Sequence, residues 1–172
     1  MRAAALIALV LLRAGCGPAV PAPGVHTAAF AAPLVDDPLR RLTRKVFDLA
    51  NRQRRLHGVR PLEWSDALGQ QARLQSMNMM ERGFFSHEDP VRGKLAARLT
   101  AAGIRWSRCG ENIFREKGMD DPADAAVEGW MKSPMHRAGL LDPLFTHAGV
   151  GIAVSPDTEY FVTETFIRPP KQ

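Results

Sequence analysis

The apolar residues of this chain first recur every three to four positions, as they do on one face of an α-helix. The first such stripe occupies 39–56 and ends at His57-Gly58. A second stripe follows Ser65, a residue type suited to cap the start of a helix. The pattern therefore predicts two amphipathic helices joined by a turn near Pro61.

Shorter helices are predicted further along. One occupies 95–102, and another begins at Asp121-Pro122, which has the cap-then-proline pattern of a helix start. Ser133-Pro134 repeats that pattern and predicts a last helical turn that carries His136.

The period then changes to that of β-strands. The β-rich runs 148–154 and 159–167 are separated by the turn residues 155–158, which predicts an antiparallel hairpin. A third strand is expected around 111–114. Helices first and a hairpin last indicate an α+β fold in which helices cover a small antiparallel sheet.

Composition indicates one domain and an exported protein. The chain has 172 residues, of which 45% are hydrophobic and 24% charged, as in ordinary globular domains. Residues 1–16 have the charged start and short apolar run of a signal peptide. We expect a Pro/Ala-rich disordered tether over 17–37, the folded domain over 38–168 and a tail over 169–172.

The cleavage site of the signal peptide stays open. Ala14-Gly15-Cys16 resembles the end of a bacterial lipoprotein signal, in which the cysteine is lipidated, so Cys16 is a candidate membrane anchor. Arg13 departs from that pattern, and Ala29-Phe30-Ala31 offers a rival cleavage site. The protein is therefore expected in the cell envelope or outside the cell.

The cysteine content excludes a disulfide framework. Cys16 and Cys109 are the two cysteines, and lipidation or removal of Cys16 would leave Cys109 without a partner. Cys109 is either a small buried hydrophobic residue or a soft metal ligand or reactive thiol.

Basic residues crowd the predicted first helix. The formal net charge is +5, and Asp48 is the single acid between Arg40 and Arg60. Such a segment can attract anionic lipid or cell-wall polymer, or it can be a solvated outer face. No nucleic-acid recognition module is apparent, so nucleic acid is not an expected partner.

Two histidines and a carboxylate are the most informative polar residues. His87 and His136 lie 24 and 25 positions from Glu111, so only a tertiary fold can gather them. Such a trio can hold a divalent metal or perform acid–base chemistry near neutral pH. Alternatively, the three side chains hydrogen-bond to loop backbone and fix the turns around them.

Several short motifs follow one another along the chain: Leu49-Ala50-Asn51, Pro61-Leu62 with Trp64, Phe85-Ser86-His87, Arg98 with Gly103, Gly110-Glu111-Asn112-Ile113, Trp130 through Arg137, and Gly149-Val150-Gly151. In this order they resemble the CAP superfamily: cysteine-rich secretory proteins, antigen 5 and pathogenesis-related 1 proteins, which share the SCP domain. The resemblance covers about 39–166 and is to the disulfide-poor bacterial branch.

The resemblance implies a three-layer α-β-α sandwich with a central cleft lined by two histidines and two acids. His87, Glu111 and His136 match three of these residues. Ser133 stands where the second acid is usual, and Glu128 either substitutes for it or faces solvent.

The resemblance further implies a binding module rather than an enzyme. Family members have been linked to lipid or sterol binding, host interaction and divalent metals. We therefore expect a small hydrophobic ligand or a cell-envelope component, or zinc held by His87, His136 and Glu111. One alternative is a metal-assisted hydrolase of peptide or cell-wall substrates with Glu111 as general base. Another is a structural envelope protein with a vestigial cleft.

Overall fold

The computed structural model describes residues 37–118 and 121–171, which all belong to one compact unit of the chain. The expected signal peptide, Cys16 and the expected tether except Asp37 lie outside these residues. Within the described part, the elements in chain order are α1 (Pro38–Leu56), β1 (Glu63–Trp64), α2 (Asp66–Arg82), α3 (Leu95–Ala101), β2 (Arg108–Lys117), α4 (Pro122–Lys132), α5 (Pro134–Leu140), β3 (His147–Val154) and β4 (Glu159–Arg168).

Polar caps fix where the main helices begin. The side chain of Asp37 accepts a hydrogen bond from the Leu39 amide at 3.0 Å, and Pro38 occupies the first turn of α1. Ser65 caps α2 in the same way. These starts are where the sequence predicted them. No helix among the described residues has the length and apolar character needed to cross a membrane.

The strands form one sheet with the order β1-β3-β4-β2. β3 and β4 form the predicted antiparallel hairpin, and β2 pairs with β4 along its whole length. β1 pairs in parallel with β3 through two residues, so the sheet is mixed rather than purely antiparallel. A two-residue strand is too short to show an alternating pattern, which is why the sequence did not indicate it.

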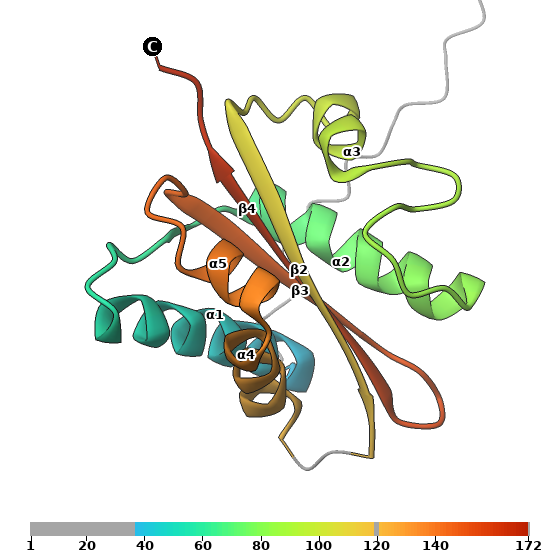
Figure 1. Ribbon diagram of the computed structural model, residues 1–172. Coiled ribbons are helices and arrows are strands. Elements are labelled where there is room, and N and C mark those ends of the chain that lie inside the picture. The colour runs from blue at the N-terminus through green and yellow to red at the C-terminus, as the bar shows by residue number, and fades with distance from the viewer. Residues whose placement is uncertain (1–36, 119–120, 172) are drawn as a thin grey trace, which may run out of the picture. The chain divides into compact units, whose positions relative to one another are not determined.

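Helices cover both faces of this sheet and confirm the predicted α+β fold (Figure 1). On one face, α1, α4 and α5 enclose the larger core cluster, which includes Trp130 and Phe166. On the other face, α2 lies against β3, where Gly149 and Gly151 leave room for its backbone. A Cβ atom at Gly151 would lie 1.9 Å from the amide nitrogen of Arg73, so only glycine permits this approach.

Glu164 is an exception within the apolar core. It lies on β4 between Val162 and Phe166, is fully buried, and neither carboxyl oxygen has a hydrogen-bond partner. Burial raises the pKa of Glu164 to about 8, although the charge of Arg54 opposes the rise. The side chain is therefore protonated in the folded protein at neutral pH.

This burial predicts a pH-dependent cost to stability. Between about pH 4.3, where an unfolded glutamate titrates, and about pH 8, the folded chain keeps a proton that the unfolded chain has lost. Stability should therefore fall as the pH rises through this window. Glu164→Gln removes the titration, so its free energy of unfolding relative to the parent should increase by about 4 kcal/mol between pH 5 and pH 9. Urea unfolding at both pH values measures the difference.

The control is Glu81→Gln, which changes an exposed glutamate on α2. This control should shift stability by the same small amount at both pH values. An identical pH dependence for Glu164→Gln and the parent would contradict a buried, protonated Glu164.

Candidate functional site

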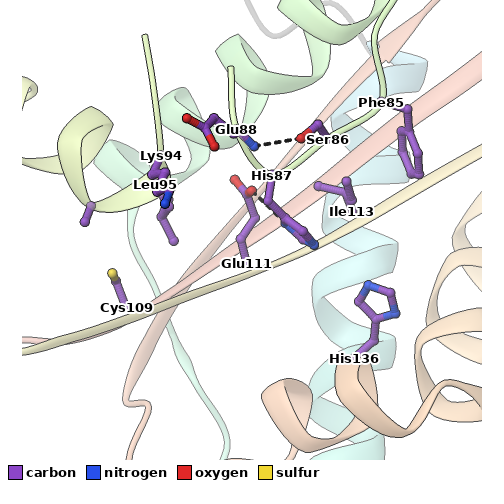
Figure 2. Close-up of a pocket in the computed structure, with 11 residues that line it drawn as sticks. Phe85, Ser86, His87, Glu88, Lys94, Leu95, Cys109, Glu111, Ile113 and His136 are labelled. Atoms are coloured by element: carbon purple, nitrogen blue, oxygen red, sulfur yellow. Dashed lines mark hydrogen bonds and ion pairs between the residues drawn. The ribbon is translucent and has the colours of Figure 1, made fainter. Parts of the chain in front are cut away.

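The fold brings His87, Glu111 and His136 together at the outer edge of the sheet. His87 lies in the loop before α3, Glu111 on β2 and His136 on α5. The two imidazole rings have centroids 6.2 Å apart and are tilted by 41°. Nδ1 of His87 lies 3.1 Å from Oε1 of Glu111. Figure 2 shows His87 beside Glu111, with His136 approaching from α5.

A buried arginine holds Glu111 in place. The side chain of Glu111 is 3% exposed, and that of Arg98, on α3, is 1% exposed. One guanidinium nitrogen of Arg98 donates to both carboxyl oxygens, at 3.0 and 3.1 Å. Because a carboxylate oxygen can only accept a hydrogen bond, Nδ1 of His87 is the donor to Glu111.

Arg98 also reaches the backbone of the loop that carries His87. It donates to the carbonyl oxygen of His87 at 3.1 Å and to the side chain of Gln75 at 2.7 Å. Gln75, on α2, in turn donates to the carbonyl oxygen of Ser86 at 2.9 Å. The backbone on both sides of the His87 peptide is thus tied to α2 and α3.

Asp89 lies inside the same loop and stabilises it through hydrogen bonds. It is 1% exposed, accepts from the amides of Val91 and Arg92, and receives the side-chain amide of Asn78 at 2.7 Å. Burial alone would raise the pKa of Asp89, but these hydrogen bonds and the charge of Arg82 outweigh burial and lower it. The loop therefore has an ionised anchor of its own.

His136 is positioned from the opposite face of the sheet. Its Nδ1 shares a 2.9 Å hydrogen bond with Oγ of Ser133, the residue before α5. Its carbonyl oxygen accepts from the side chain of Asn112 on β2 at 3.1 Å. Burial, and then the charge of His87, lower the pKa of His136. The imidazole is therefore neutral at pH 7.

Two hollows meet at this trio. One has a volume of about 720 Å³ and an apolar wall formed by Phe85, Leu95, Ala96 and Ile113. The other has a volume of about 750 Å³ and includes the more polar residues on the α5 side. His87, Glu111 and His136 line both hollows, so a ligand in either one can reach the imidazoles.

Cys109 lies on the wall of the first hollow, half-buried and without a disulfide. Burial, together with the charge of Glu111, raises the pKa of its thiol, although Arg98 acts in the opposite direction. The thiol is therefore protonated near neutral pH. Among the described residues, no group of three or more His, Cys, Asp or Glu side chains is arranged to hold a metal ion.

The other possible acid and the two other histidines of the described part do not join the trio. Glu128 is on α4, is 67% exposed and forms an ion pair with Lys132 at 3.1 Å, and it lines neither hollow. Ser133, which stands where the second acid is usual, contacts His136 through its hydroxyl. His57 bonds to the backbone of its own helix, and His147 faces Glu63 at the opposite edge of the sheet.

The polar residues that hold the trio were not assigned roles from the sequence. Arg98 stands between Leu95 and Leu99 on a short helix, so a charged side chain falls on its apolar face. Gln75 and Asn78 likewise interrupt the buried face of α2. A polar residue inside an apolar stripe is the signal that could have found them, because such a residue needs a buried partner.

The chain also matches known proteins over this region. Residues 47–166, which include every residue of the trio and Arg98, match the cysteine-rich secretory protein (CAP) family. The chain belongs to the CAP family. The uncharacterized protein YkwD of Bacillus subtilis (strain 168) is 37% identical over 112 residues, which are 65% of this chain and 42% of YkwD. The chain thus spans less than half the length of that relative.

Solved structures share the fold of this CAP domain. An extracellular protein of Bacillus anthracis that contains an SCP domain is 32% identical, with a TM-score of 0.66 over 80% of this chain and 45% of that one. An outer surface protein of Borrelia burgdorferi is 15% identical, with a TM-score of 0.70 over 78% of this chain and 97% of that one. The second likeness shows the fold alone.

Replacement of Arg98 tests whether this residue holds Glu111 and the loop of His87 in place. Arg98→Met keeps most of the apolar stem but leaves Glu111 buried without its cation, so we expect a loss of about 3–5 kcal/mol in the free energy of unfolding. The additional change Glu111→Gln removes the unpaired buried charge and should restore part of the lost free energy of unfolding. Denaturant unfolding measures both effects.

The matched control is Arg105→Met, which removes an exposed arginine nearby. This control should change stability by less than about 0.5 kcal/mol. A loss of the same small size for Arg98→Met would show that the buried ion pair does not hold the site.

Proposed function

We propose that this CAP domain is an exported binding module whose cleft holds a divalent metal between His87 and His136. The signal-like residues 1–16 support export, as does the likeness to a Bacillus anthracis protein described as extracellular. Anchoring through a lipid on Cys16 is part of the proposal.

The observation that carries the proposal is the state of the two imidazoles. Nδ1 of His87 is engaged by Glu111 and Nδ1 of His136 by Ser133. Each ring therefore keeps Nε2 for a ligand. Metal-binding histidines in proteins usually bond through the other ring nitrogen to a carboxylate or similar acceptor, which fixes tautomer and orientation.

The residues present fit a divalent ion with an open coordination sphere. Metal–nitrogen bonds of about 2.0–2.1 Å place two imidazole centroids on one zinc ion about 5–6 Å apart. The observed 6.2 Å requires only a small adjustment. The lowered pKa of His136 favours the neutral ring that metals bind. Water or ligand atoms would complete the coordination, and the bound ion would supply a Lewis acid that attracts anionic or carbonyl oxygen.

The contacts of Glu111 favour binding over hydrolysis. A general base needs a free oxygen within reach of the water that it activates. Both oxygens of Glu111 face Arg98, and one also accepts from His87. Glu111 therefore serves to orient His87.

The apolar hollow favours a ligand with a hydrophobic part. Its volume of about 720 Å³ suits a small lipid-like molecule or an apolar piece of a cell-envelope component. A polar head on such a molecule would meet His87 and His136, which line the same hollow.

Metal binding provides the test. We expect isothermal titration of chelator-treated protein with zinc to show about one site per chain. His136→Ala should weaken binding by about 100-fold or more, because one of two protein ligands is lost. Ser133→Ala should weaken binding by about 10-fold, since it removes only the partner of Nδ1.

His57→Ala is the matched control, because it removes an imidazole that lies outside the cleft. Its zinc affinity should equal that of the parent. Equal affinities for the parent and His136→Ala would contradict the proposed site.

A further inference from the structure

The outer face of α1 carries a line of cations that the cleft does not use. Arg41, Lys45 and Arg52 lie within about 40° of one another around the helix axis, at 100° per residue, with Arg44 and Arg55 beside them. The buried residues of α1, from Val46 to Arg54, point the opposite way. The line spans about 21 Å at 1.5 Å per residue.

The cations of this face differ in their partners within the described structure. Lys45 forms ion pairs with Asp121 and Asp124. Arg44 lies over the rings of Phe47 and Trp64, at 5.9 and 6.0 Å from their centroids. Arg52 and Arg55 form no ion pair among the described residues, and Asp48 is the one acid of the helix. The long side chains enclose a shallow hollow of about 520 Å³.

An exposed apolar side chain lies at the end of the line. Leu56, next to Arg55, is 67% exposed. Leu49 lines the hollow between the cations. A water-soluble polyanion would stabilise the charges but would not bury these leucines, whereas the acyl region beneath lipid headgroups would do both.

We propose that the outer face of α1 docks on an anionic lipid bilayer. A straight helix presents its cations along one line, which suits a flat surface, and each lysine or arginine near such a surface contributes about 1 kcal/mol. α1 packs over β3, an inner strand, whereas His87 and His136 meet beside β2, which is an edge strand.

Flotation with lipid vesicles tests this proposal. The full chain carries Cys16→Ser in every arm, so that no acyl anchor contributes, and neutral phosphatidylcholine vesicles set the baseline. Vesicles with about one third phosphatidylglycerol should bind the protein more strongly, and about 0.5 M salt should abolish the gain. Arg52→Glu with Arg55→Glu should lower the partition coefficient at least about 30-fold.

The control pair is Arg105→Glu with Lys171→Glu, which changes net charge equally at exposed positions away from α1. It should change binding by less than about threefold. Circular dichroism checks folding, and Arg52→Gln with Arg55→Gln replaces the first pair if the glutamates unfold α1.

Three outcomes would overturn the proposal: equal binding to both vesicle types, an equal loss for both variant pairs, or tighter binding to soluble polyphosphate than to vesicles. The last outcome would assign the face to a polyanion. His136→Ala should bind vesicles like the parent, so the result does not depend on the metal site.

Discussion

The buried ion pair between Arg98 and Glu111 is the interaction on which the cleft depends. Neither charge can be left alone in the interior without a penalty of several kcal/mol, so each fixes the position of the other. The same guanidinium binds the His87 carbonyl and Gln75, which joins α2, α3, β2 and the intervening loop. Together with the hydrogen bonds of Asp89, these contacts make the loop a support for one imidazole.

The second imidazole comes from the other layer of the sandwich. Ser133, the residue before α5, and Asn112, on β2, form hydrogen bonds with His136, and among the described residues neither side chain is hydrogen-bonded to Arg98. The two networks use different hydrogen bonds but share β2, where Glu111 and Asn112 are neighbours.

Much of this architecture could be predicted from the sequence because its signals are local. Asp37, Ser65 and Asp121 mark helix starts through their own side chains, and the hairpin follows from its turn. β2 was predicted at 111–114 but extends over Arg108–Lys117, since charged residues at both ends hide its period. These ends pair with β4, which is tertiary information.

The site was predictable only in part. The histidines and Glu111 stand in recognisable motifs, but the partner of Glu111 depends on a charged residue 13 positions away on a different element. The sequence could not show whether Glu128 takes the place of the second cleft acid, because the direction of its side chain depends on where the helix that carries it ends. The structure places Ser133 against His136 and Glu128 against Lys132.

Glu111, which Arg98 holds in place, fixes His87 with its proton on Nδ1 and leaves Nε2 free. Long-range ¹H–¹⁵N NMR of the imidazole side chains, on metal-free protein above the pKa of histidine, measures this directly. We expect Nδ1 of His87 to be protonated and Nε2 to be unprotonated. A neutral His87 with its proton on Nε2 would contradict it.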